Sequence, residues 1–173
     1  MIFNFKKFNE KSQLLLAPNG KVSNLNITQW NLVRDKSFTN WFGDWENNPE
    51  NASKIVDENG EPLVVYHGTS KMFYKFNSRY SAQGVFWFSS DKNIIERGES
   101  GAVSVKVLIP VFISAKKLAG WKEYQPLTLG QIEDRGFEAI QLDDDYVVFE
   151  PNLIKLANGS NTQFDKNNSD IRK

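Results

Sequence analysis

The sequence predicts an α+β domain of two small, mostly antiparallel sheets with short helices, preceded by a helical extension. Apolar stretches of strand length dominate the second half of the chain, and long helical patterns do not regularly separate them as in a doubly wound parallel sheet. The glycine fingerprint G-x-G-x-x-G and the phosphate-binding motif G-x-x-x-x-G-K-[ST] are both absent. With 173 residues, the chain is long enough for one domain with a sizeable core.

Composition excludes several classes of function. Twenty-one basic and 21 acidic residues give a formal net charge of zero, so the chain lacks the basic field of non-specific nucleic-acid binding. The absence of cysteine excludes disulfides, thiolate zinc sites and cysteine nucleophiles, and a single histidine argues against a His-based metal site. No apolar stretch approaches the ~18 residues of a membrane span, and the N-terminus is too charged for a secretory signal. We therefore expect a cytoplasmic protein without a metal.

The first third of the chain divides into two parts. Residues 1–26 are polar and turn-rich and are expected to be flexible. Residues 27–60 carry tryptophan and phenylalanine at spacings of three and four, which predicts short amphipathic helices packed on the main domain. Thr28 is the expected N-cap of the first helix, and Ser37 or Thr39 that of the second.

The remaining chain is predicted to be rich in strands. The predicted strands span residues 62–67, 84–89, 103–114, 137–142 and 146–149. Pro110 suggests an edge position or a bulge in the third of them. After Gly159 the chain is rich in asparagine, so residues 158–173 are expected to form a loosely held polar tail.

Two helices are predicted between these strands. Ser90 is the expected N-cap of a short helix that begins at Asp91. Thr128 and Gln131 have the spacing of a capping box, which predicts a helix that ends at Gly136.

Three short stretches carry residues suited to chemistry. His67, the single histidine, ends an apolar strand and opens onto Gly68 and Thr69. Trp87 lies in an aromatic strand, and Asp145 directly precedes the last predicted strand. This order resembles the diphtheria-toxin/poly(ADP-ribose) polymerase class of ADP-ribosyltransferases, whose signature is a His, a Tyr and an acid.

A closer resemblance covers residues 24–173, which look like the ADP-ribosyltransferase domains of phage and mobile-element polyvalent proteins. The motifs that add to His-Gly-Thr are WFGDW (41–45), VDENGEP (56–62) and FEPNLIK (149–155). The resemblance implies an ADP-ribosyltransferase-like split β-sandwich that binds NAD+ as co-substrate. It implies cleavage of the nicotinamide–ribose bond and transfer of ADP-ribose to a macromolecule, for which neutral charge favours a protein. The implied parts are a flexible segment (1–26), a Trp-rich helical extension (27–60), an NAD-binding core (61–157) and a polar tail (158–173).

Transferred residue by residue, the family pattern makes Asp145 and His67 the catalytic residues. It places His67 on a ribose hydroxyl and Gly68 on the nicotinamide carboxamide, with Thr69 beside them. Trp87 becomes one wall of the nicotinamide slot. These residue types suit the chemistry, because a carboxylate favours the positive charge that develops on the ribose and an aromatic face holds the cationic pyridinium.

Two departures from the family pattern leave other functions open. The helix after the aromatic strand carries no aromatic residue, so Tyr80 is the candidate for the second ring of the nicotinamide slot. Ser89 shares a strand face with Trp87 and completes the expected NAD-binding set. Asp145 is one methylene shorter than the commoner Glu, a difference of about 1.5 Å that matters for positioned chemistry. The alternatives are a catalytically inactive interaction module of the same fold, or an NAD glycohydrolase toxin.

The identity of the acid is also open from the sequence. Asp143, Asp144 and Glu150 compete with Asp145, and three consecutive aspartates are also typical of a solvated turn. Side chains alternate along a strand, so Asp145 and Glu150 cannot both face the same cleft unless a bulge intervenes. Likewise, His67 and Trp87 have a purely structural alternative as core residues.

Overall fold

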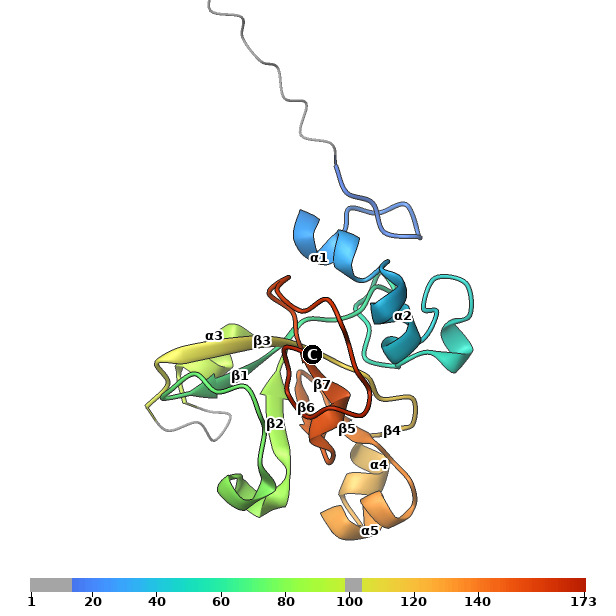
Figure 1. Cartoon of the computed structure of the whole chain (residues 1–173). Coiled ribbons are helices and arrows are strands. Elements are labelled where there is room, and N and C mark those ends of the chain that lie inside the picture. Colours follow the sequence, from blue (N-terminus) through green and yellow to red (C-terminus); the bar gives the residue numbers. More distant parts are fainter. Residues whose placement is uncertain (1–13, 99–103) are drawn as a thin grey trace, which may run out of the picture.

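The computed structural model describes residues 14–98 and 104–173, which form a seven-stranded sheet flanked by short helices (Figure 1). The strand order is β4-β5-β6-β2-β1-β3-β7, and each neighbouring pair is antiparallel except β4 with β5. The strands are β1 (Val65–Thr69), β2 (Phe86–Ser89), β3 (Val107–Ile113), β4 (Leu118–Ala119), β5 (Ala139–Leu142), β6 (Asp145–Val148) and β7 (Ile154–Leu156). The α-helices are α1 (Ile27–Leu32), α2 (Lys36–Phe42), α3 (Lys92–Glu96), α4 (Trp121–Tyr124) and α5 (Leu129–Asp134). Short 3-10 helices are η1 (Pro49–Asn51), η2 (Ser78–Tyr80), η3 (Ala82–Gly84) and η4 (Pro151–Leu153).

The predicted α+β class is confirmed, and in place of two separate sheets the structure has one seven-stranded sheet made of two halves. β1 pairs with β3 over five residues, and β2 pairs with β6 over four. The two halves meet at a single registered pair, Tyr66 with Ser89, beyond which β1 and β2 part. The fold therefore opens in the middle of the sheet, between the end of β1 and the start of β2.

Side chains on the two faces of the β2–β6 pair enter different parts of the core. Phe88 and Tyr146 belong to the cluster that β1 and β3 also line. Val147 and Phe149 belong to a second cluster, which includes Ile132 of α5. This alternation is the one predicted for the strand that follows Asp145.

The aromatic stripe of residues 27–60 packs on the main domain, as predicted. Phe38 and Phe42 of α2 are buried and share a cluster with Phe112 of β3. The Phe38 and Phe112 rings meet edge to face with their centroids 5.1 Å apart. Large rings from both α2 and β3 are buried at this contact, so the stripe adds apolar area to the core.

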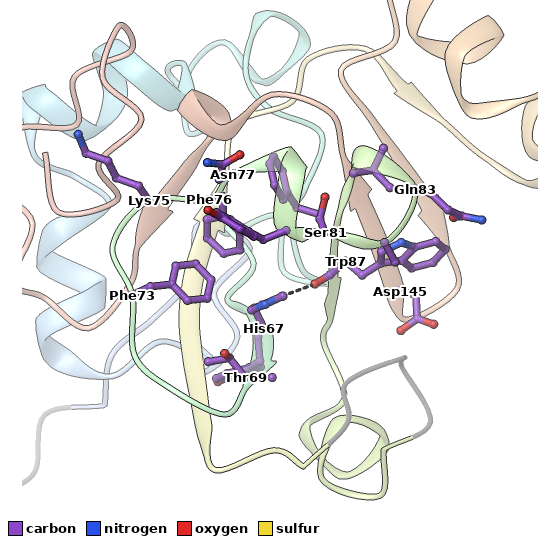
Figure 2. A pocket seen from close by; sticks show the side chains of 16 residues that line it. His67, Thr69, Phe73, Lys75, Phe76, Asn77, Ser81, Gln83, Trp87 and Asp145 are labelled. Atoms are coloured by element: carbon purple, nitrogen blue, oxygen red, sulfur yellow. Dashed lines mark hydrogen bonds between the residues drawn. The ribbon is translucent and has the colours of Figure 1, made fainter.

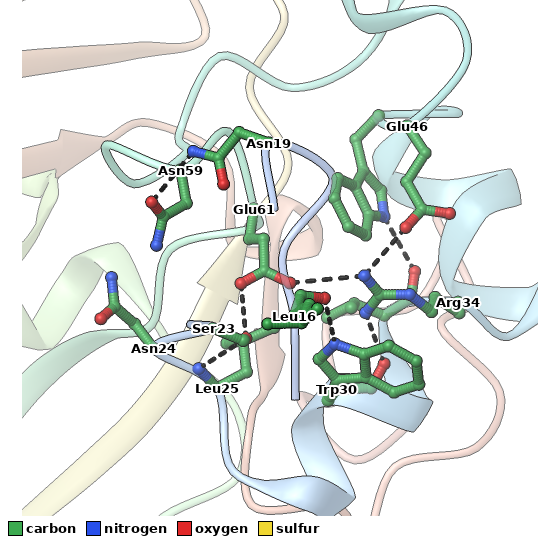
Figure 3. Close-up of polar contacts among 12 residues, drawn as sticks. Leu16, Asn19, Ser23, Asn24, Leu25, Trp30, Arg34, Glu46, Asn59 and Glu61 are labelled. Carbon is green, nitrogen blue, oxygen red and sulfur yellow. Dashed lines mark hydrogen bonds and ion pairs between the residues drawn. The ribbon is translucent and has the colours of Figure 1, made fainter. Parts of the chain in front are cut away.

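Ion pairs and ring contacts of Arg34 connect residues 27–60 to the chain that leads into β1 (Figure 3). The Arg34 guanidinium lies 3.8 Å from the ring centroid of Trp30 and 5.0 Å from that of Trp45. It also forms ion pairs of 2.9 Å with Glu46 and 3.4 Å with Glu61. The Glu61 side chain is fully buried, so Arg34 supplies the charge that this carboxylate needs.

The predicted caps of the first two helices are wrong. Asn26, not Thr28, caps α1 through a capping box. Asp35 caps α2, where its side chain accepts from the backbone N–H of Ser37, and Thr39 lies inside the helix. Both helices begin earlier than the apolar pattern indicated, and the cap is the Asn or Asp whose side-chain oxygen reaches an unpaired N–H.

Of the two later caps, one is confirmed. Asp91, not Ser90, caps α3 by accepting from the N–H of Asn93. Thr128 and Gln131 form the predicted capping box at the start of α5.

Pro110 lies neither in an edge strand nor at a bulge, because β3 runs between β1 and β7 in continuous register. It stands at the end of the β3–β7 ladder, where its carbonyl accepts from the N–H of Ala157. The carbonyl of Ala157 accepts from the Gln29 side chain at 2.9 Å, so the missing N–H of proline leaves no group unpaired there.

The expected loose tail is wrong: residues 158–173 pack against the domain. Phe164 and Ile171 are buried in two different core clusters. The buried Lys155 amino group donates to the carbonyls of Asn168 and Asp170. The prediction was wrong because it was based on polar composition, whereas a few buried side chains and hydrogen bonds to the backbone hold this segment against the domain. Residues 1–13 and Val103, which the predictions included, lie outside the described residues.

No helix in the described part of the chain is long and apolar enough to cross a membrane.

Candidate functional site

A pocket of about 1040 Å³ lies where β1 and β2 part (Figure 2). Its walls come from the end of β1, the loop of residues 70–85, the start of β2 and the first residue of β6. Of the predicted site residues, the pocket brings together His67, Gly68, Thr69, Tyr80, Trp87 and Asp145.

His67 stands at the centre of the pocket in a cage of phenylalanine rings. Its ring centroid is 5.8 Å from that of Phe73, 5.1 Å from Phe76 and 5.6 Å from Phe88. Its Nδ1 lies 2.8 Å from the carbonyl oxygen of Trp87. Since a carbonyl can only accept, Nδ1 carries the proton and Nε2 is left as an acceptor. Burial lowers the pKa of the imidazole, so the ring is neutral at pH 7.

Trp87 and Asp145 lie on the same face of neighbouring strands. Trp87 pairs with Val147, and Asp145 lies two residues before Val147, so the two side chains are diagonal neighbours. Both line the pocket. Where β2 and β6 line the pocket, an aromatic face therefore lies beside a carboxylate.

The Asp145 carboxylate has an unsatisfied oxygen. Its Oδ1 is buried and has no hydrogen-bond partner among the described residues. A buried acceptor without a donor is destabilising by about 1–3 kcal/mol, and such atoms are rare in folded proteins. The competing acids Asp143, Asp144 and Glu150 are exposed and do not line the pocket. Of the four candidate acids, Asp145 is therefore the one that lines the pocket.

Ser89 does not line the pocket, contrary to the prediction. It is fully buried, and its hydroxyl lies 3.2 Å from the carbonyl oxygen of Asp144, to which it donates. Ser89 lies between Tyr66 of β1 and Asp145 of β6 in the sheet, and both of these neighbours line the pocket while Ser89 is covered. Ser89 instead holds the turn from which Asp145 projects.

Tyr80 lies at the mouth of the pocket in η2 and is 90% exposed. No described ring stacks on it. Its side chain is therefore available to a ligand in the pocket.

The loop that follows β1 also lines the pocket, and it was not predicted from the sequence. Phe73 and Phe76 form one wall of the pocket, and Lys75, Asn77 and Gln83 line its rim. The signal that could have found this wall is the spacing of two phenylalanines within ten residues of His67.

In the described part of the chain, no group of three or more His, Cys, Asp or Glu side chains is arranged to hold a metal ion.

Comparison with known proteins agrees with the geometry. The family model described as ADP-ribosyltransferase in polyvalent proteins matches residues 57–145, about half of the chain. This range contains the whole lining of the pocket, from Tyr66 to Asp145. No curated protein and no solved structure matches the chain significantly. The chain belongs to the family of ADP-ribosyltransferase domains found in polyvalent proteins.

Proposed function

We propose that this protein is an NAD-dependent ADP-ribosyltransferase whose active site is the pocket between β1 and β2. The observation that carries the proposal is the buried, unpartnered Oδ1 of Asp145 beside the Trp87 ring, in the pocket that also holds His67. An acceptor atom without a donor fits a site where a substrate hydroxyl supplies the missing hydrogen bond. Bound NAD+ would supply ADP-ribose through its labile nicotinamide–ribose bond.

The pocket offers a distinct contact to each part of the nicotinamide riboside. The Trp87 face suits the flat, cationic pyridinium, an interaction worth on the order of 0.5–2 kcal/mol. Gly68, which has no Cβ, lets the carboxamide approach its backbone. Nε2 of the neutral His67 accepts a hydrogen bond from a ribose hydroxyl, which orients the sugar.

Asp145 would act on the reacting sugar. Its Oδ1 accepts from the ribose 2′-hydroxyl, and its negative charge favours the positive charge that develops as the bond to nicotinamide breaks. Nicotinamide leaves with the bonding electron pair, the acceptor nucleophile forms a bond to the same ribose carbon, and the proton of the nucleophile passes to solvent. Tyr80 is the proposed second ring of the nicotinamide slot, because α3 carries no aromatic residue.

The acceptor is proposed to be a protein. The chain has no net charge to concentrate it on a nucleic acid, so a protein side chain suits the surface better. The resemblance to polyvalent proteins supports a phage or mobile-element origin and action in the host cytoplasm.

The test combines nicotinamide release from NAD+ with transfer of labelled ADP-ribose in a host lysate. We expect Asp145→Asn to lower turnover by about 10²-fold or more, since it removes the charge that stabilises the transition state. His67→Ala should also lower turnover. Asp143→Asn is the matched control, because Asp143 is exposed, lies on the same turn and has a φ of 55°, which asparagine tolerates.

The outcomes separate the candidate functions. A labelled protein that disappears in Asp145→Asn but not in Asp143→Asn supports the transferase. Nicotinamide release without any labelled protein would show a glycohydrolase instead. No release and no NAD+ binding by calorimetry would leave an inactive interaction module.

A further inference from the structure

The pocket has a charge at each end. Among its described lining residues, the formally charged ones are Lys75 and Asp145, since His67 is neutral. Figure 2 shows them on opposite sides of His67, with Trp87 on the side of Asp145 and Phe73 on the side of Lys75. The pocket is therefore polarised along its length, from a carboxylate to an ammonium group.

Lys75 is held in place by the C-terminal segment. The backbone N–H of Ile171 donates to the carbonyl of Tyr74 at 2.9 Å, and Lys75 forms an isolated β-bridge with Asp170. The carbonyl of Ile171 accepts from Leu156 of β7 at 2.8 Å. Residues 170–171 thus act as an extra strand between β7 and the pocket loop, and they determine where the lysine emerges.

Among the described residues, the amino group of Lys75 makes no ion pair, although its positive charge contributes to the lowered pKa of the Asp170 carboxyl. Asp170 is the nearest candidate, but its carboxylate already accepts from Arg172 Nε at 2.9 Å, Arg172 Nη2 at 2.7 Å and the Arg172 backbone at 3.0 Å. The guanidinium of Arg172 is itself stacked 4.0 Å over the Tyr74 ring. No carboxylate in the described part of the chain lies within ion-pair distance of Lys75. The exposed Lys75 therefore lies at the rim of the pocket, and its ammonium group has only a longer-range attraction to Asp170.

We propose that Lys75 binds the diphosphate of the dinucleotide, so that the pocket matches the order of charges along NAD+. The inference rests on the proposed function. NAD+ carries a cationic pyridinium at one end and a diphosphate with about two negative charges in its middle. With the pyridinium against Trp87 and Asp145, the diphosphate extends past His67 toward Lys75. A lysine ammonium is a compact point charge that binds phosphate oxygens by charge-assisted hydrogen bonds.

The test compares two probes that each carry one of the two charges. ADP-ribose has the diphosphate but no pyridinium, and nicotinamide riboside has the pyridinium but no phosphate. In calorimetry at low salt, we expect Lys75→Gln to weaken ADP-ribose binding about tenfold and to leave nicotinamide riboside binding unchanged. Lys75→Arg should restore most of the affinity, and the KM for NAD+ should rise in Lys75→Gln with little change in kcat.

Lys71→Gln is the matched control, because Lys71 lies on the same loop, is exposed and does not line the pocket. Equal ADP-ribose affinity in Lys75→Gln, Lys71→Gln and the unaltered protein would overturn the role of Lys75 while the proposed function stands. If the unaltered protein binds neither NAD+ nor ADP-ribose, the proposed function is wrong, and the inference about Lys75 is overturned with it.

Discussion

His67 makes a structural contact and also has a proposed role in the pocket. Its Nδ1–H bonds to the Trp87 carbonyl on the strand across the opening, which orients the ring. The surrounding phenylalanines remove the ring from water, which lowers the pKa of the imidazole from the ordinary value of 6.5. An imidazole held neutral in this way presents an acceptor nitrogen to a hydroxyl at physiological pH.

We therefore predict a pH profile for this residue. Protonation of His67 removes the Nε2 acceptor, so kcat/KM for NAD+ should be level around pH 7 and should fall on a limb centred below pH 6.5. The free energy of unfolding should also decrease as the pH falls below 6.5, because the unfolded chain takes up the proton first. Urea denaturation over this range checks the second part, with His67→Gln as a control that lacks the loss. A limb of the kcat/KM profile that depends on His67 and is centred above pH 6.5 would contradict a neutral imidazole at pH 7.

At the scale of an element, the end of α2 depends on one glycine. Gly43 has a φ of 102° and follows the helix directly against η1. A Cβ at this position would lie 2.4 Å from the Cα of Ala52, which is backbone and cannot move aside. Both the backbone conformation and the close approach therefore require glycine.

We predict opposite effects for two glycine substitutions. Gly43→Ala should lower the free energy of unfolding by about 3 kcal/mol or more, because strain and overlap act together. Gly130→Ala should raise it by roughly 0.5–1 kcal/mol, because Gly130 lies inside α5 with open space where a Cβ would be. Urea denaturation of both variants measures the difference. A tolerated Gly43→Ala would mean that the α2–η1 contact is looser than described.

At the scale of the whole molecule, polar and apolar contacts connect the extension of residues 27–60 to the core. Arg34 connects the two through the buried carboxylate of Glu61, and its ring contacts hold Trp30 and Trp45 (Figure 3). Ser53 adds a second connection, since its hydroxyl donates to the carbonyl of Ile113 in β3 at 2.9 Å. Shared core and shared polar contacts favour one cooperative unit.

This arrangement predicts the result of a double-mutant cycle. Arg34→Met should lower the free energy of unfolding by about 2–4 kcal/mol, because it leaves the Glu61 charge buried without a partner. The double variant Arg34→Met/Glu61→Gln should lose much less free energy of unfolding than the sum of the two single losses, because no buried charge remains. Tryptophan fluorescence reports mainly on the extension and far-UV circular dichroism on the whole fold, and their transitions should coincide. Separate transitions would show that the extension is an independent unit.

Features that depend on local pattern could be predicted from the amino-acid sequence. Alternation of side chains predicted the strand that follows Asp145, and the spacing of Thr128 and Gln131 predicted the cap of α5. His67, Trp87 and Asp145 in this order, together with the motifs at 41–45, 56–62 and 149–155, indicated the family, which the match over residues 57–145 confirms.

Which of these residues come together in space depends on how the strands pair. β1 and β2 part beyond the pair Tyr66–Ser89, and the pocket at this opening is lined by Asp145 but not by Ser89, which is fully buried. The burial of the C-terminal segment and the resulting position of Lys75 depend on contacts with residues nearly a hundred positions away. Such contacts leave no periodic signal in a single sequence, because they arise from how strands far apart in the chain pair and diverge.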